Sequence, residues 1–496
     1  MPRIGRTTCV RALAPYSAGG GETLSLAGVE AALACAAFAV LCVLVLRVAP
    51  QLVEPDDYAY RASIVAMTEG HFLTLSGAQV HALAGQLGGP GGPGPAGAVP
   101  GPAAHGLGGG RIAGGGGVIA QWVQLPDGRW ISEKDPGYPF LAAPFQALGI
   151  IRWAPLFYGA LACLGLFAGA RRWLGRFGGA AAVGLYCSSG AALLFAWRDY
   201  MPTFTDASLI AAGSGALLWA VLATEASSRR RTWAGLAGFV ALEAATFVRY
   251  TDIVVLGSAV VAVIMAWRLR GARLPSAAVG WWLGSVAVFG AGVAIFDDLV
   301  YGGPLTTGYH PGEIQFGLGA IVPNLRYTPA HLIQAMPMLV LGLAALVWII
   351  VRWVRLRRAV GEPGLVVRRD MSVGLALAAS WLAVWALYSA YYWTANAFGT
   401  TLQFARFYVP ALGAISLLGA WLVTRIPGRA WLAGLTSAAV VAAMFGLGAW
   451  SYHDMVRSRI GGIAQPCTGQ RPGTKPGPAG IHCSGGPRTV TGGPGG

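Results

Sequence analysis

The sequence predicts an all-α membrane protein that crosses the bilayer many times, and three observations support this. Hydrophobic residues make up 55% of the 496-residue chain, charged residues make up only 11%, and the mean hydropathy is +0.57. Soluble proteins carry about 25% charged residues, so this composition excludes an ordinary soluble globular protein. Apolar runs of about 20 residues, long enough to cross a hydrocarbon core about 30 Å thick as helices, recur along the chain.

About eleven apolar runs, within a range of about ten to thirteen, meet this length requirement. They lie at residues 27–48, 153–170, 178–196, 205–224, 233–248, 252–267, 277–296, 335–351, 371–391, 407–424 and 430–449. The first run is expected to be an uncleaved anchor, because no small-residue cleavage site follows it closely. A cytoplasmic segment at 1–26 then precedes a transmembrane domain at 27–451.

Arginines in the short loops predict the orientation, because cytoplasmic loops of membrane proteins are enriched in Lys and Arg. With the N-terminus inside, twenty arginines fall on the cytoplasmic side, whereas the short outer loops carry one arginine each. The same alternation makes residues 138–150 a juxtamembrane helix instead of a span. We therefore expect a multi-pass cell-membrane protein with an outside C-terminus. Its charge of +15 is then a topology signal, and nucleic-acid binding is not supported.

Two segments are predicted to lie outside the helices of the membrane domain. The first outer loop, residues 49–152, contains a Gly/Pro-rich insertion at 84–118, which is expected to be disordered because it cannot bury enough apolar surface. The outer tail at 452–496 is expected to be disordered for the same reason. It contains Cys467 and Cys483, for which a disulfide and two free thiols both stay open.

Acidic residues gather on the predicted outer side, where fourteen of the twenty lie. The most informative group is Glu54-Pro55-Asp56-Asp57-Tyr58, directly after the first span. Adjacent carboxylates on a helix point in different directions, so one can bind a metal or a phosphate-bound cation while the other meets a substrate hydroxyl. The alternative is that both residues only cap the helix beginning near Tyr58.

A second polar group, Ser132-Glu133-Lys134-Asp135-Pro136, ends the same loop where the chain re-enters the membrane. A Lys here can serve as a point charge on a phosphate, and the neighbouring Glu can serve as a metal ligand. The alternative is an ordinary surface turn with a local ion pair, which contributes little.

Taken in order, these motifs resemble the GT-C superfamily of integral-membrane glycosyltransferases, in particular the protein O-mannosyltransferase and lipid A aminoarabinose transferase group. Asp56 and Asp57 look like the acidic motif of that family's first outer loop. Glu133-Lys134-Asp135-Pro136 looks like its Glu-Lys-Pro or His-Pro-Pro segment, with one extra residue before the proline. Other similar segments are the helix at 138–150, the span that ends at Arg172, the Arg198-Asp199-Tyr200 turn with Asp206, and residues 247–250, 301–309 and 406–410.

The resemblance implies inverting transfer of a sugar, a hexose or a pentose, from a polyprenyl-phosphate donor to a protein, lipid or glycan acceptor at the outer membrane face. A carboxylate must take the acceptor proton, and Asp56 or Asp57 is assigned this role, with Asp56 preferred. Cations must stabilise the leaving phosphate, and the candidates are Lys134, Arg249, Arg326, Arg406 and Arg198. Asp57 and Glu133 are candidate ligands of a divalent metal. The expected cavity residues are Tyr58, Asp206, Asp298 and Tyr309.

A polytopic transporter of a lipid-linked or small polar substrate is the rival function. Transporters usually show internal repeats and helices that are broken near the middle of the membrane. The sequence shows no convincing repeat, and its acids lie at the outer ends of the predicted spans. These two observations favour the transferase.

Overall fold

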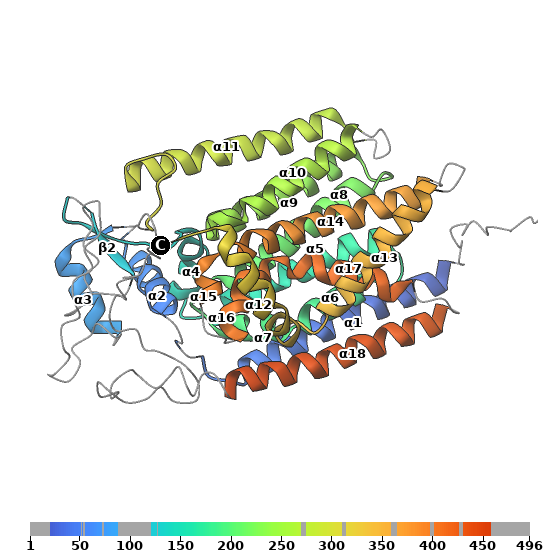
Figure 1. The fold of residues 1–496 in the computed structure, drawn as a ribbon, viewed down its shortest axis with the longest axis horizontal. Helices are drawn as coiled ribbons and strands as arrows, with labels where there is room; N and C mark the ends of the chain where they lie inside the picture. The colour runs from blue at the N-terminus through green and yellow to red at the C-terminus, as the bar shows by residue number, and fades with distance from the viewer. Residues whose placement is uncertain are drawn as a thin grey trace, which may run out of the picture.

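The computed structural model describes residues 20–50, 52, 55–71, 74–87, 121–125, 127–268, 274–309, 314–358, 365–396, 401–425 and 430–457. These residues form a bundle of long helices that run side by side (Figure 1). Eight helices are long and apolar enough to cross a membrane, and two bent helix pairs raise the number to ten. The predicted all-α polytopic fold is therefore confirmed.

The membrane-length helices are α1 (Gly20–Leu46), α5 (Trp153–Leu174), α8 (Thr203–Leu222), α10 (Ile253–Arg268), α11 (Ser276–Tyr301), α14 (Leu365–Ser389), α17 (Leu412–Thr424), which continues α16 (Thr401–Tyr408), and α18 (Ala430–Met455). One bent pair is α6 (Gly178–Cys187) with α7 (Gly190–Trp197), at 60°. The other is α12 (Ile321–Ala335) with α13 (Leu339–Arg358), at 115°. Pro337 lies in the second bend, where its ring cannot continue a helix.

Helix α9 (Ser228–Val248) accounts for the difference between about eleven expected spans and the ten found by length and composition. Its 21 residues are long enough to cross a membrane, but Arg229, Arg230, Arg231 and Glu243 lower its mean hydropathy. The helix packs between α8 and α11, and Glu243 accepts a hydrogen bond of 2.9 Å from Ser285 Oγ of α11. Helices α8, α9 and α10 lie side by side, and the chain reverses direction from each one to the next (Figure 1).

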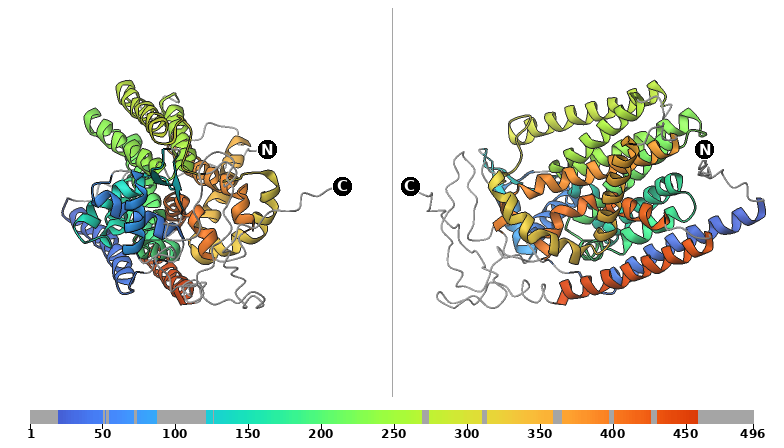
Figure 2. Two further views of the ribbon diagram at one scale, coloured as in Figure 1. Left: turned by 90° about the vertical axis from the view of Figure 1, so that its left-hand side faces the viewer. Right: turned by 45° about the vertical axis from the view of Figure 1, so that its right-hand side comes forward.

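Small residues bring the central helices into close contact. Gly165 and Gly169 on α5 face Ala212 and Gly215 on α8, and a Cβ added to Gly215 would lie 2.1 Å from the Gly165 carbonyl oxygen. Membrane helices associate through such contacts, because lipid gives them no hydrophobic driving force to associate. Helix α8 is thus packed tightly at the centre, whereas α11 lies apart and contacts mainly α9 (Figures 1 and 2).

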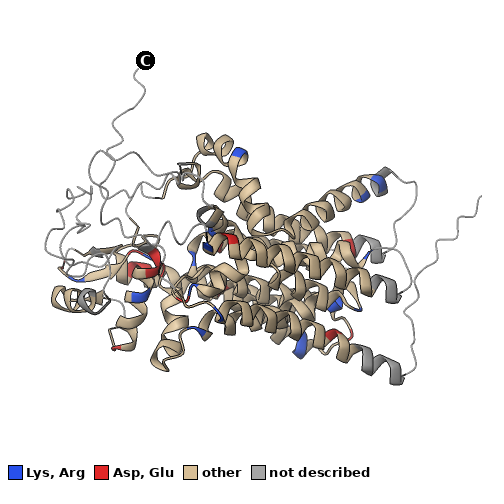
Figure 3. Ribbon diagram, turned by 90° about the horizontal axis from the view of Figure 1, so that it is seen from below, with Lys and Arg blue, Asp and Glu red and all other residues tan. Residues whose placement is uncertain are grey.

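The two ends of the bundle differ in structure and charge. One end, here the sheet end, carries α2 (Pro55–Thr68), α3 (Gly77–Leu87), α4 (Gly137–Ala147) and a three-stranded antiparallel sheet in the order β1-β3-β2. The other, here the basic end, carries arginines where α5, α13 and α17 end and α9 begins (Figure 3). Helix α1 begins at the basic end, and α18 ends at the sheet end (Figure 1).

The first loop contains more regular structure than expected. Strands β1 (Thr74–Leu75), β2 (Trp122–Gln124) and β3 (Trp130–Ser132) were not predicted, because strands of two or three residues are too short to show an alternating pattern. Helix α4 confirms a helix within the predicted juxtamembrane segment 138–150. Helix α3 includes residues 84–87 of the insertion predicted to be disordered. Residues 88–118 and 458–496, with Cys467 and Cys483, lie outside the described residues.

Candidate active site

Charged side chains from several separate elements are brought together at the sheet end. Asp56 and Asp57 lie in the first turn of α2, and Glu133, Lys134 and Asp135 follow β3. Arg198 follows α7, Asp206 lies in the first turn of α8, Arg249 follows α9, and Arg406 lies in α16. We call these nine residues the charged cluster. Burial of so many ions requires that they be paired with one another.

Asp56 bridges two cations within this cluster. Its Oδ1 lies 3.4 Å from Lys134 Nζ, and its Oδ2 lies 3.1 Å from Arg406 Nη1. Burial by itself would raise the pKa of Asp56, but the positive charges of Lys134 and Arg406 outweigh burial and hold the pKa below its usual value. Asp56 is therefore ionised and held at the point where the two cations meet.

Asp57 points in a different direction and pairs with Arg198. The distance from Arg198 Nη2 to Asp57 Oδ2 is 2.6 Å, and both side chains are essentially fully buried, at 0% and 1% exposure. The sequence-based prediction that the two adjacent carboxylates diverge is thus confirmed. The buried pair fixes the start of α2 against the turn after α7.

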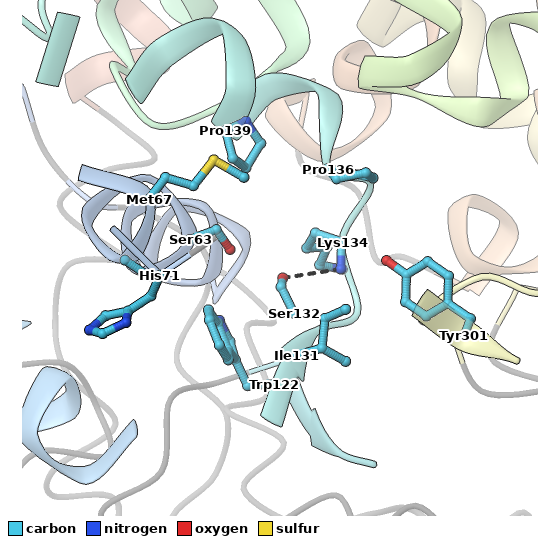
Figure 4. Close-up of a pocket in the computed structure, with 11 residues that line it drawn as sticks. Ser63, Met67, His71, Trp122, Ile131, Ser132, Lys134, Pro136, Pro139 and Tyr301 are labelled. Atoms are coloured by element: carbon cyan, nitrogen blue, oxygen red, sulfur yellow. Dashed lines mark hydrogen bonds between the residues drawn. The ribbon is translucent and has the colours of Figure 1, made fainter. Parts of the chain in front are cut away.

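Lys134 lies between two carboxylates and an aromatic ring. Its Nζ is 3.3 Å from Glu133 Oε1, and it lies 4.8 Å from the centroid of the Tyr309 ring. Burial lowers the Lys134 pKa, but the charges of Asp56 and Glu133 outweigh burial and raise it. Figure 4 shows Lys134 beside Ser132, whose Oγ accepts a hydrogen bond from the Lys134 backbone N–H, with the Tyr301 hydroxyl pointing toward it. The lysine is therefore a fixed positive charge.

Arg406 lies against two aromatic rings. Its guanidinium carbon is 4.5 Å from the centroid of Trp393 and 4.6 Å from that of Phe407. Cation–π contact with both rings stabilises a partly desolvated guanidinium in one orientation. Nothing in the sequence alone required Trp393 to line the site. Its packing on Arg406 makes it part of the site.

A second arginine adjoins this arrangement through the backbone. Arg249 Nη1 donates a 3.0 Å hydrogen bond to the carbonyl oxygen of Arg406, and Arg249 Nε lies 3.7 Å from Asp206 Oδ2. Asp135 accepts a 3.4 Å hydrogen bond from the backbone N–H of Tyr250. Burial raises the pKa of Asp135 to about 7, because its hydrogen bond and the nearby cations offset only part of the desolvation.

Some predicted site residues lie outside the charged cluster. Arg326 is exposed on α12, and its guanidinium carbon stacks 5.4 Å from the ring centroid of the adjacent Tyr327. Asp298 is exposed at the end of α11, whereas its neighbour Asp297 is buried and accepts a 3.0 Å hydrogen bond from the Tyr250 hydroxyl. Tyr58 is half-buried on α2.

Buried Asp252, next to Asp206 and Arg249, was missed by the sequence analysis as a site residue. It lies two residues after the 247–250 motif, and this position was the signal that could have identified it.

The donor set proposed for a divalent metal does not fit the geometry. The Asp57 carboxylate is paired with Arg198 and the Glu133 carboxylate with Lys134, so each faces a cation. Among the described residues, no group of three or more His, Cys, Asp or Glu side chains is placed to hold a metal ion. Divalent ions of the hard kind need six or more oxygen ligands, and these two carboxylates would supply few of them.

No protein-family model and no curated protein matches this chain. Among solved structures, the chain is similar to ArnT from Cupriavidus metallidurans bound to undecaprenyl phosphate, with 15% identity and a TM-score of 0.48 over 90% of this chain and 72% of that one. The apo state of ArnT is 15% identical to this chain, with a TM-score of 0.46 over 85% of this chain and 64% of that one. An Archaeoglobus fulgidus oligosaccharyltransferase in complex with zinc and sulfate is 13% identical, with a TM-score of 0.39 over 65% of this chain and 45% of that one. These proteins are GT-C glycosyltransferases.

Proposed function

We propose that this chain is a membrane glycosyltransferase that transfers a sugar from a polyprenyl-phosphate donor to an acceptor at the sheet end of the bundle. The observation that carries the proposal is the Asp56 carboxylate held between Lys134 and Arg406. A carboxylate bound by two cations marks a place where a phosphate oxygen fits equally well. The site also lies at one end of membrane-length helices, where the phosphate of a lipid whose tail is in the bilayer would lie.

The donor phosphate is proposed to bind between Lys134 and Arg406, with Arg249 behind them. Lys134 and Arg406 are rigid, since Lys134 is held by two carboxylates and Arg406 by two rings. Rigid cations stabilise charge that develops on a leaving phosphate without reorganising during the reaction. Arg198 is committed to Asp57, and Arg326 is exposed on α12, so neither has a part in this phosphate site.

Asp56 is proposed to be the base. In the free site its pKa is held down by the same two cations, so the carboxylate is a weak base. When a donor phosphate takes over Lys134 and Arg406, that stabilisation is lost and the pKa of Asp56 rises toward the range useful for proton transfer. Asp56 is also more exposed than Lys134 and Arg406: 17% of its side chain is accessible, against 7% for Lys134 and 11% for Arg406. An acceptor hydroxyl can therefore reach it.

The proposed step is a single inverting displacement. The acceptor oxygen forms a bond to the anomeric carbon, and its proton passes to Asp56. The bond between the anomeric carbon and the phosphate oxygen breaks, and its electron pair stays on the polyprenyl phosphate, which Lys134 and Arg406 neutralise. The step is complete with these groups, and no metal ion is needed as a reactant. Whether the sugar is a hexose or a pentose and whether the acceptor is protein, lipid or glycan is left to the assay.

The sheet end is proposed to face the outside, because the arginine-rich ends of α5, α9 and α13 lie at the other end of the bundle and mark the cytoplasmic side. The rival transporter function would use broken helices to line a substrate path. The break between α6 and α7 is instead filled by α18: a Cβ added to Gly448 would lie 1.7 Å from the Ser188 carbonyl oxygen. This packing favours the transferase.

The test uses the full chain in proteoliposomes with undecaprenyl phosphate carrying radiolabelled hexoses or pentoses, and a total membrane extract as acceptor. We expect one labelled donor to be consumed and free undecaprenyl phosphate to appear. Asp56→Asn should lower this rate by at least about 100-fold, because the base is lost. The same variant should bind undecaprenyl phosphate at least as tightly as the parent, because the phosphate no longer competes with Asp56. Consumption of no donor, or full activity of Asp56→Asn, would refute the proposal.

A further inference from the structure

A groove runs between α5, α8 and α9 at the basic end of the bundle, far from the charged cluster. Its volume is about 670 Å³, and it is open to the surface. Two small residues, Ala168 and Ala216, leave room along it, and Gly165, Trp219 and Trp233 line it as well. The small residues belong to the same helix pair that packs so closely at Gly169 and Gly215. The groove therefore follows from the packing of α5 against α8.

The arginines near this groove divide into two kinds. Arg231 is buried, and its Nε donates a 2.9 Å hydrogen bond to the carbonyl oxygen of Ala220 at the end of α8. Arg172 donates a 3.1 Å hydrogen bond to the Leu222 carbonyl oxygen and forms an ion pair with Glu225. Both therefore serve the C-terminus of α8, where cations complement the helix dipole.

Arg229 and Arg230 differ from Arg172 and Arg231, which bind the C-terminal end of α8. Both are exposed, both line the groove, and neither has an ion-pair partner within the described ranges. The nearby acid, Glu225, is already paired with Arg172. The mouth of the groove consequently carries two uncompensated positive charges beside an apolar channel.

We infer that this groove binds an anionic phospholipid of the bilayer. Its phosphate lies at Arg229 and Arg230, and one acyl chain follows Gly165, Ala168 and Ala216. Basic pockets between membrane helices suit anionic lipid head groups, and tryptophans such as Trp233, which is 62% exposed, sit at the depth of those head groups. The lipid joins α5 to α9 across α8, at the end of the molecule away from the chemistry.

The inference is tested by native mass spectrometry of the purified full chain with phosphatidylglycerol or phosphatidylcholine of the same acyl chains. The parent should retain phosphatidylglycerol preferentially. Arg229→Gln with Arg230→Gln should reduce that retention by about 25-fold, since each arginine near a membrane surface contributes about fivefold. Ala216→Phe, which fills the channel, should reduce the retention of both lipids.

The matched control is Arg352→Gln with Arg355→Gln on α13, which removes two positive charges from the same end but lies outside the groove. This control should retain phosphatidylglycerol like the parent. Equal retention by the Arg229/Arg230 variant and the parent would overturn the inference. Equal loss in both double variants would overturn it too, because the effect would then be general attraction to the basic end. Melting temperatures of the variants separate lipid loss from misfolding.

Discussion

At the sheet end acids and cations are buried against one another, whereas at the basic end Arg229, Arg230 and Arg355 point outward to their surroundings. The difference follows from what each end has to do. Exposed arginines need only sit on the correct side of a membrane, and water and head groups solvate them. Buried ions lose that solvation and persist only where geometry supplies partners. Position therefore matters far more for the buried charges of the sheet end than for these exposed arginines.

The largest expected effect comes from breaking the most buried pair. Arg198→Met should lower the free energy of unfolding by about 3–5 kcal/mol, because it leaves the Asp57 carboxylate buried without its cation. Denaturation in detergent micelles measures the change. Arg355→Met on α13, an exposed arginine at the basic end, should cost less than about 1 kcal/mol. Similar losses in both variants would mean that the two ends do not differ as argued.

The next effect concerns rate. Arg406→Gln should slow sugar transfer by about 100-fold, since one fixed cation at the leaving phosphate is lost. Arg406→Lys should recover part of the loss, because it restores the charge but not the planar contact with Trp393 and Phe407. The transfer assay with a saturating donor and circular dichroism of the variants provide the measurement. Equal rates for Gln and Lys would show that the charge of residue 406 is irrelevant.

The local parts of the site could be predicted from sequence, whereas its pairings could not. Asp56, Asp57, Glu133 and Lys134 stand out because they lie at the ends of apolar runs, where any charge is conspicuous. The contact of Asp56 with Arg406 joins residues 350 positions apart, and only the folded bundle brings them together.

The outer arginines show the limit most clearly. Arg326 and Arg406 look alike in sequence, as single arginines in short predicted outer loops. Arg406 differs because it contacts Trp393 and Phe407 and pairs with Asp56, while Arg326 lies on the exposed face of α12. The positions of the helices could be predicted, because an apolar run indicates a membrane span. The same run does not indicate which other helix packs against that span.

A smaller effect is expected in the dependence of stability on pH. The folded-state pKa of Asp135 is about 7, above the ordinary value near 4, so the folded state holds the proton more strongly between these values. Asp135 therefore costs increasing stability as the pH rises from about 4 to about 7. Asp135→Asn should raise the melting temperature more at pH 7 than at pH 5. Asp127→Asn is the control, because that residue is exposed and its pKa is lowered, so its effect should be equal at both values.

The smallest effect is expected at Arg326, and it is the sharpest test of the boundary of the site. If charge anywhere in the outer loops assisted the leaving phosphate, Arg326→Gln would slow transfer as Arg406→Gln does. The exposed position of Arg326, with Tyr327 beside it, predicts a rate within about twofold of the parent, as for a surface substitution away from any buried pair. The same transfer assay, run on both variants side by side, measures the contrast. A loss at Arg326 as large as that at Arg406 would extend the phosphate site to α12 and contradict the boundary proposed for it.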